Sequence, residues 1–393
     1  MPAPWRCRTS RRWAARFRRA HQILSVLPRK IAGPDMALKI IPFISSVMRR
    51  FIPSPSGHEI RAAVRVGLAV GLPLLTIFAM GRLDLAVFAA FGALTALYGH
   101  SEPSGRRVGT QLVVAVALTL TMAAATFFAA AQGPTWLLGV LLVAVVLCSG
   151  ALGAVMGWVP RGEIFFVLVL LVLAGIPATW TKALVGTAVG LGAALFSVAL
   201  TVLDRTLAGD TGKPDRLRDR IAARLASIER RQHVISVVAA TVGVLAAWLA
   251  ALALGIGHPY WASVVVTALM PALLSSRVRS RVVHVLAGTL GGVAMAAVIF
   301  AFEPSPLELI VMIMVCQAIA ELFIAKNFGL ALLFLSPLAI GMSNLGRGLP
   351  WGPLMADRLV EAGLGAAIGL AVIFVVRELA GIRLEEPSQV EAR

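Results

Sequence analysis

The amino-acid sequence predicts an all-α integral membrane protein of about twelve transmembrane helices, arranged as two parallel six-helix repeats with cytoplasmic N- and C-termini. Three observations lead to this prediction: the composition, the succession of apolar stretches and the placement of arginine. Of the 393 residues, 59% are hydrophobic and 14% are charged, and the mean hydropathy is +0.86. Soluble domains are about half apolar and a quarter charged, so the bilayer must solvate much of this chain.

Apolar stretches of helical length follow one another along the sequence. A transmembrane helix needs roughly 20 mainly apolar residues, and most stretches come close to this length. The first six predicted helices are 62–80, 84–98, 108–131, 136–158, 163–176 and 182–203. The second six are 233–254, 260–274, 282–302, 307–324, 328–345 and 355–376.

Positive charge alternates from loop to loop. Cytoplasmic loops of membrane proteins carry an excess of Lys and Arg, and a cytoplasmic N-terminus places most of the basic residues on that side. These are Arg106, Arg107, Arg161, Arg205, Lys213, Arg216, Arg218, Arg220, Arg224, Arg230, Arg231, Arg277, Arg279, Arg281 and Lys326, with Arg377 and Arg383 in the tail. The loops assigned to the outside and their adjoining helix ends hold Arg82, Lys182, Arg347 and Arg358. The asymmetry supports the predicted topology.

The net charge of +17 reflects this topology. Because the basic residues gather at the N-terminus and on one side of the membrane, their partner is expected to be the lipid bilayer and not a nucleic acid. Arginine greatly outnumbers lysine, and Ala, Gly and Val are abundant, as in proteins from GC-rich bacterial genomes. The expected location is a bacterial inner membrane.

Residues 1–57 form a basic segment that is expected to contact anionic headgroups from the cytoplasm. Arg11 and Arg12 resemble the start of a twin-arginine signal. However, Pro-Arg-Lys at 28–30 stands where such a signal has its apolar run and cleavage site, which excludes this interpretation. The alternative is that Met36 is the true start of the chain.

The two halves align with a shift of about 174 residues. Residues 101–107 fall opposite 275–281, and both 190–194 and 363–367 read Gly-Leu-Gly-Ala-Ala. Because six is an even number, both repeats enter from the cytoplasm, and a pseudo-twofold axis along the membrane normal is expected to relate them. The predicted segments are the basic cytoplasmic segment 1–57, the first repeat 58–204, the basic cytoplasmic connector 205–232, the second repeat 233–378 and the cytoplasmic tail 379–393.

The second predicted helix of each half is short. About 15 residues span roughly 22 Å, less than the ~30 Å hydrocarbon core, and short segments at corresponding positions of two repeats are typical of a transport site. Arg107 and Arg281 follow these helices at equivalent places, and His284 lies one turn further on. Since a guanidinium matches the two oxygens of a carboxylate, these residues are hypothesised to bind an organic anion on the cytoplasmic side. The alternative is that the arginines only fix the topology and contact lipid phosphates.

Lys182 and Arg358 begin the sixth and twelfth predicted helices, near Asp357 and Glu361. These residues are candidates for an exit gate or for proton-linked pairs on the substrate path. The alternative is that the basic side chains extend to the membrane interface.

Glu321 lies near the inner end of the tenth predicted helix, one turn from Gln317. Acidic residues inside membranes are energetically costly and often functional, so Glu321 is a candidate for proton coupling. The alternative is a pair with Lys326.

No enzyme signature is present. Gly212-Lys213 lacks the remaining residues of a phosphate-binding loop, and His58-Glu59 is followed by Ala62 where a zinc protease needs histidine. None of the three cysteines has a C-x-x-C neighbour. We therefore expect no catalytic residues, no cofactor and no metal.

Residues 258–262, His-Pro-Tyr-Trp-Ala, open a predicted helix, and 281–292 combine an arginine with a glycine-rich helix start. Residues 91–93 and Arg107 form a degenerate version in the first half. On these residues the chain resembles, over 61–376, the fusaric acid resistance protein-like family, which is related to aromatic acid exporters and plant aluminium-activated malate transporters. The resemblance implies movement of aromatic or other organic anions across the inner membrane, with basic helix ends lining a pore between two six-helix units. Between and after its two halves, no substantial cytosolic domain of the kind found in larger family members is expected.

Three functions remain open. The first is a secondary exporter of aromatic carboxylates or similar anions that uses the proton gradient, for which Glu321 and His284 are candidate coupling groups. The second is a passive anion channel, which needs only basic residues along the pore. The third is a membrane scaffold in envelope biogenesis without transport. The glycine-rich helix faces are compatible with a monomer and with a homodimer.

Overall fold

Helices make up all regular structure in the residues that the computed structural model describes, which are 56–99, 102–158, 163–207, 209, 217–324 and 326–382. Eight of these helices are long and apolar enough to cross a membrane. They are α3 (Gly57–Ala79), α5 (Ser104–Ala130), α6 (Thr135–Met156), α8 (Trp180–Leu207), α10 (Arg230–Ala253), α12 (Val278–Phe300), α13 (Pro306–Ile324) and α15 (Trp351–Ala380). The prediction of a multi-pass helical membrane protein is therefore confirmed.

Four shorter apolar segments lie between the long helices, and we call them the short helices. They are residues 83–97, built from η1 (Leu83–Leu85), α4 (Ala86–Ala93) and η2 (Leu94–Leu97); α7 (Ile164–Ala174); α11 (Tyr260–Leu269) with η3 (Met270–Ala272); and α14 (Phe328–Asn344). They coincide with the second and fifth predicted helices of each half. Each of the other predicted helices coincides with a long helix, and a complete crossing by the four short helices stays a prediction.

A further helix, α9 (Leu217–Ser227), lies within the predicted connector 205–232. Arg220 of α9 holds it in place by donating from Nη2 to Glu102 Oε1 (3.2 Å) and to the carbonyl of Met156 (2.8 Å). We call the end of the bundle that carries α9, the start of α3 and the end of α15 the connector end, and the opposite end the distal end. The predicted basic segment 1–57 and tail 379–393 lie largely outside the described residues.

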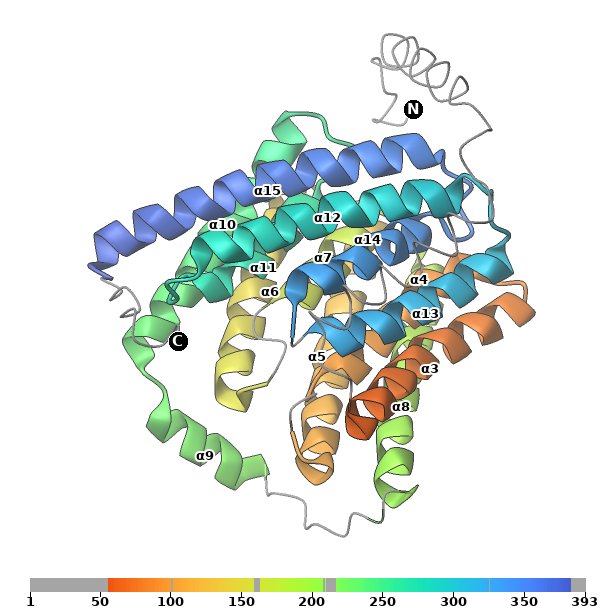
Figure 1. The fold of residues 1–393 in the computed structure, drawn as a ribbon, viewed down its shortest axis with the longest axis horizontal. Helices are drawn as coiled ribbons and strands as arrows, with labels where there is room; N and C mark the ends of the chain where they lie inside the picture. The colour runs from red at the N-terminus through yellow and green to blue at the C-terminus, as the bar shows by residue number, and fades with distance from the viewer. Residues whose placement is uncertain are drawn as a thin grey trace, which may run out of the picture. The chain divides into compact units, whose positions relative to one another are not determined.

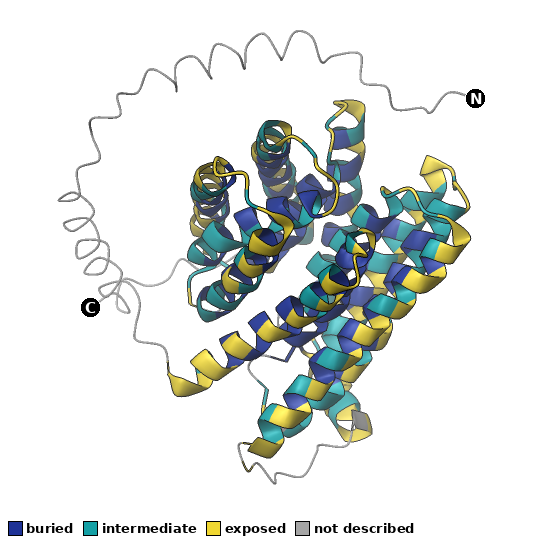
Figure 2. Ribbon diagram, turned by 90° about the vertical axis from the view of Figure 1, so that its right-hand side faces the viewer, coloured by how far each residue is buried: buried dark blue, intermediate teal, exposed yellow. Residues whose placement is uncertain are grey.

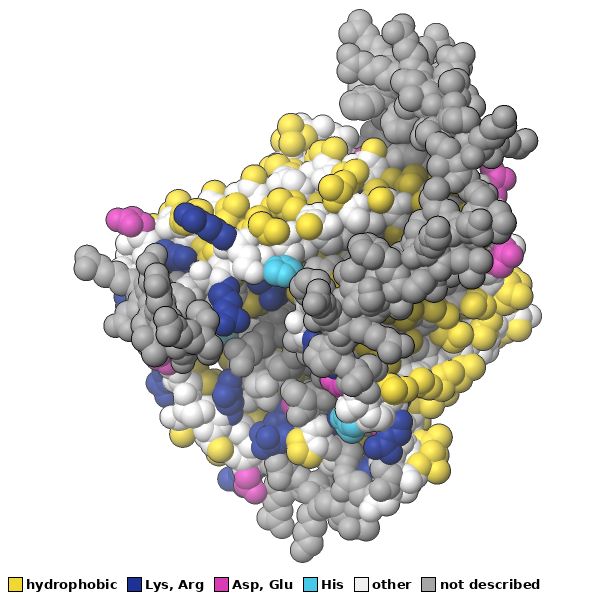
Figure 3. All heavy atoms as spheres, viewed as in Figure 1, with side chains coloured by type: hydrophobic (Ala, Val, Ile, Leu, Met, Phe, Trp, Pro, Cys, Tyr) yellow, Lys and Arg dark blue, Asp and Glu magenta, His cyan; other side chains and the backbone are white. Residues whose placement is uncertain are grey.

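The outward faces of the long helices are apolar. Large side chains such as Leu120 (65% exposed), Leu184 (61%) and Val298 (64%) point away from the protein, and Figure 2 shows exposed positions along the outer faces and buried ones inside. In Figure 3 hydrophobic side chains cover the upper and right-hand parts of the face, whereas Lys and Arg gather at the left and below, toward α9. Exposed apolar area of this extent is expected when lipid, not water, surrounds the helices.

The helices of the two halves, α3–α8 and α10–α15, pack in matching pairs. Within each half the second helix packs on the sixth (α4 on α8, α11 on α15), and the third packs on the fifth (α5 on α7, α12 on α14). Between the halves, the first helix of one packs on the fourth of the other: α3 lies beside α13, and α10 beside α6 (Figure 1). The short helices are thereby enclosed by long ones.

Glycine allows the closest of these contacts. A Cβ atom on Gly92 of α4 would overlap the backbone of Gly190 in α8. A Cβ atom on Gly365 of α15 would overlap the carbonyl oxygen of Ala262 in α11. The second and sixth helices of both halves therefore cross at glycine, as small residues permit in membrane bundles.

Replacement of this glycine tests the crossing. Gly365→Ala is expected to lower the free energy of unfolding by about 1–3 kcal/mol, because the methyl group must displace the α11 backbone. Gly363, on the same helix, has no atom within 4 Å of a Cβ position, so Gly363→Ala is the matched control. Thermal unfolding in detergent measures both variants. Equal melting temperatures for the two would contradict the close crossing.

Candidate functional site

A cavity of about 520 Å³ lies among the short helices. This volume falls in the range of small-molecule binding sites, roughly 300–1,000 Å³. All four short helices contribute to its wall, and α3, α8, α12, α13 and α15 add single residues or small groups. The lining thus comes from both halves of the chain.

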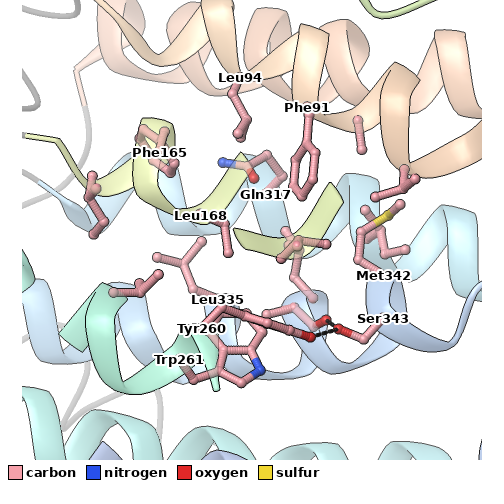
Figure 4. A pocket seen from close by; sticks show the side chains of 18 of the residues that line it. Phe91, Leu94, Phe165, Leu168, Tyr260, Trp261, Gln317, Leu335, Met342 and Ser343 are labelled. Atoms are coloured by element: carbon pink, nitrogen blue, oxygen red, sulfur yellow. Dashed lines mark hydrogen bonds between the residues drawn. The ribbon is translucent and has the colours of Figure 1, made fainter. Parts of the chain in front are cut away.

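The wall is mainly apolar and rich in aromatic side chains. Figure 4 shows side chains from each short helix around the same space: Phe91 and Leu94, Phe165 and Leu168, Tyr260 and Trp261, and Leu335 and Met342. The polar groups include the amide of Gln317 and the hydroxyls of Tyr260 and Ser343, whose oxygens lie 3.4 Å apart. Such a wall accommodates a planar apolar body and offers it few hydrogen bonds.

Charged residues line the cavity toward its two ends. Arg281 of α12 and Glu321 of α13 belong to the connector end. Toward the distal end the lining residues are Asp84, Lys182, Arg347 and Arg358. Cations therefore outnumber anions along this wall, which favours an anionic occupant.

Arg281 holds its place through two contacts. Its Nε donates to the carbonyl of Ala268 in α11 at 2.8 Å. Its guanidinium carbon lies 4.6 Å from the centroid of the Phe328 ring at the start of α14. The side chain is partly exposed, so this arginine combines a fixed position with access from the cavity.

Arg107, although equivalent to Arg281 in sequence, is not among the cavity-lining residues. It is 3% exposed, and its Nε and Nη2 donate to the carbonyls of Gly99 (3.0 Å) and Glu102 (2.9 Å). Gly99 has a φ of +74°, so Arg107 closes a tight turn between η2 and α5. The structure does not bring Arg107 and Arg281 together in one site.

His284 also lies outside the lining. It is exposed on α12, and its Nδ1 contacts the carbonyl and the hydroxyl of Ser280, one turn earlier. His284 does not contact the cavity, and its role in proton coupling remains a prediction.

Glu321 lies on the wall and is 4% exposed. Its charge interacts with those of Arg65 and Arg107 from the first half. Lys326, the alternative partner, instead donates to Glu59 of α3 at 2.9 Å. Glu321 therefore belongs to an electrostatic cluster that joins the two halves near the connector end.

Arg358 is the most buried of the predicted distal cations. It is 3% exposed, and its guanidinium carbon lies 4.1 Å from the centroid of the Trp261 ring. Its Nε and Nη1 atoms have no hydrogen-bond partner among the described residues. One turn further along α15, Glu361 is completely buried and accepts a hydrogen bond from the backbone N–H of Ala262 (3.1 Å), in the first turn of α11.

Lys182 begins α8 and lines the same end of the cavity. It is only partly buried, and its charge interacts with that of Asp84. Asp84 in turn accepts hydrogen bonds from Arg82 at 3.0 and 3.1 Å.

The candidate residues predicted from the sequence did not include Glu163, which precedes α7 at the connector end. It is 5% exposed and lies against Gly150 of α6. Nearby, Tyr98 packs against both Trp158 and the cavity-lining Phe165, with ring centroids 5.3 and 6.0 Å away.

This region contains further buried polar groups without partners in the described part of the chain. They are the hydroxyl of Tyr98, Nε1 of Trp158 and Oε1 of Gln111. Together with Glu163 they form a group of buried polar side chains beside the cavity-lining Phe165. Only the three-dimensional contacts between four separate segments reveal it.

The described residues contain no group of three or more His, Cys, Asp or Glu side chains that is placed to hold a metal ion.

A segment of the second half, which supplies α11 to α14 and the residues Arg281 and Arg358, matches a known protein family. Residues 245–372 match the fusaric acid resistance protein-like family. The resemblance predicted from 258–262 and 281–292 is therefore confirmed over this segment. Both predicted motifs lie within the fusaric acid resistance protein-like region, and so do the last part of α10 and most of α15.

One relative is an uncharacterised membrane protein, YvaC, of Bacillus subtilis (strain 168). It is 31% identical over 126 residues, which amount to 32% of this chain and 20% of YvaC. The aligned part thus spans about a fifth of that relative. No solved structure matches the chain.

The burial of Glu163 leads to a prediction about stability. Its side chain is 5% exposed, and an ionised carboxylate removed from water is energetically costly. Glu163→Gln replaces the carboxyl group by a neutral amide of similar shape. This variant is expected to raise the melting temperature at pH 8.

Thermal unfolding in detergent at pH 8 measures the effect. Glu229, an exposed carboxylate that precedes α10, provides the control variant Glu229→Gln, which should keep the wild-type melting temperature. An unchanged or lower melting temperature for Glu163→Gln would contradict the cost of the buried carboxyl group.

Proposed function

We propose that the protein is a secondary transporter of the bacterial inner membrane, and not an enzyme, that exports aromatic carboxylates or other organic anions through the central cavity. The observation that carries the proposal is the aromatic, apolar cavity with cationic side chains toward both ends. The fusaric acid resistance protein-like region supports it, because it supplies most of this wall.

The proposal includes two parallel six-helix repeats with both termini in the cytoplasm. The matching helix contacts of the two halves support the repeat, and the basic side chains near α9 support a cytoplasmic connector end. Substrate sites of such transporters lie at the repeat interface and involve short or interrupted helices. The cavity meets this description, since short helices of both halves surround it.

An organic anion in lipid needs compensation for the water it leaves. Arg281 and Glu321 lie at the end where cytoplasmic substrate enters under this proposal, and Lys182, Arg347 and Arg358 at the end where it leaves. Apolar and aromatic side chains in between take up the aromatic body. Glu321 and Glu163 are the acidic residues best placed to couple transport to protons.

A passive anion channel is the second candidate. The specific observation that favours it is that the lining residues extend from Arg281, at the connector end, to Arg347, at the distal end. Basic residues along the pore are sufficient for a channel, whereas an exporter needs a group that changes protonation during the cycle.

Flux measurements in liposomes test the proposal. Purified protein is expected to move benzoate and related aromatic acids, and an imposed pH gradient should change the rate of the exporter. Arg281→Gln is expected to lower the flux about tenfold, because a charged hydrogen-bonding group at the cavity wall is lost.

Arg279, which is exposed on the same first turn of α12, provides the matched control Arg279→Gln. It removes the same charge from the same end of the protein but not from the cavity. Equal loss in both variants would reduce the role of Arg281 to topology. Flux that responds to voltage but not to a pH gradient would establish the channel instead.

A further inference from the structure

Arg358 differs from the other buried arginines in what its guanidinium contacts. Arg107 and Arg281 donate to backbone carbonyls, and Arg65 forms an ion pair with Asp204 at 3.0 Å. Within the described residues, the guanidinium of Arg358 makes no hydrogen bond and no ion pair, although it is 3% exposed. A buried cation without an acceptor is energetically costly, so its retention at the wall of a cavity calls for an explanation.

The neighbouring carboxylates do not supply the missing acceptor. Oδ2 of Asp357 lies 2.7 Å from Nδ1 of His258, which belongs to the loop before α11. Glu361 uses one oxygen to accept from the N–H of Ala262, and neither carboxylate forms an ion pair with Arg358. The charge of Glu361 still offsets part of the charge of Arg358 across one helical turn.

The Trp261 ring occupies one face of the guanidinium, at 4.1 Å. A cation held on an aromatic face keeps its planar edge, where all N–H donors point, available for an acceptor in the same plane. A carboxylate matches this edge with two parallel hydrogen bonds. Trp261, Tyr260 and the guanidinium line the same cavity, so a ligand anchored there has an aromatic wall beside its apolar part.

The charge at this end accommodates one added negative group. Lys182 and Arg347 line the same end as Arg358, whereas the lining carboxylate Asp84 is already paired with Arg82. A monocarboxylate would therefore meet a local excess of positive charge even with Glu361 ionised.

We propose that Arg358, held on Trp261, is the residue that binds the carboxylate group of the transported anion, in the distal half of the cavity. This inference rests on the proposed function and deepens it, since it assigns the residue that recognises the charged group of the ligand. Arg281 then serves entry at the opposite end, and Arg358 sets specificity.

Direct binding to the detergent-purified full chain tests the anchor. The probes are benzoate and its neutral isostere benzamide, and the readouts are calorimetric affinity and the ligand-induced rise in melting temperature. Arg358→Gln is expected to weaken benzoate binding tenfold or more and to leave benzamide binding unchanged. Arg358→Lys keeps the charge but loses the planar fork, so it should also bind benzoate more weakly than wild type.

Arg279→Gln is the control, because Arg279 is exposed and does not belong to the cavity lining. It should bind both probes as wild type does. Wild-type benzoate affinity in both Arg358→Gln and Arg358→Lys would overturn the anchor but leave the proposed function intact. If wild-type protein neither binds nor transports benzoate or related aromatic acids, the proposed function fails, and the anchor fails with it.

Discussion

The length of the short helices constrains the whole architecture. At 1.5 Å per residue, the 11 residues of α7 cover about 16 Å, roughly half of the hydrocarbon core. Helix ends that stop inside the membrane leave backbone groups that lipid cannot satisfy. The long helices solve this by surrounding the short ones, and the cavity occupies the space that the short helices leave between them.

Glycine makes this enclosure possible. The sixth helix of each half approaches the short second helix so closely that a Cβ atom would not fit between them. In the first half a Cβ atom on Gly92 would overlap Gly190, and in the second half a Cβ atom on Gly365 would overlap Ala262. Short helices held in this way are fixed by backbone contact, so the side chains on their other faces are free to define the cavity. The same arrangement occurs in both halves, and both contribute to the wall of the site, the second half more than the first.

Much of the fold follows from the sequence, because hydrophobic length and loop charge report directly on membrane insertion. The predicted range 163–176 was the shortest, and it corresponds to α7, which lines the cavity. The roles of the arginines do not follow in the same way. Arg107 and Arg281 occupy equivalent positions, but the turn at Gly99 draws Arg107 into a structural contact, and no local pattern distinguishes the two.

The surroundings of Arg358 and Glu163 also could not be predicted from the sequence, because they depend on contacts between distant segments. Arg358 could be predicted as a candidate from its place at a helix start, but its lack of an acceptor depends on how His258 and α11 engage the neighbouring carboxylates. Glu163 becomes notable only where Tyr98, Gly150 and Trp158 surround it. Charge in this protein is thus divided between groups that stabilise turns and contacts and groups left available at the cavity.

The central claim is that the space among the short helices is a ligand-accessible path. Cysteine labelling tests it most directly, in a background where Cys7, Cys148 and Cys316 are replaced. The variants Phe91→Cys and Leu335→Cys each place one cysteine on the cavity wall. Both cysteines are expected to react with a charged, membrane-impermeant thiol reagent, and benzoate is expected to slow this reaction. Cysteines at the outward-facing Leu290 and Val298, 60% and 64% exposed, should stay unlabelled in lipid. Unlabelled cavity positions, or labelling that benzoate does not slow, would contradict the account.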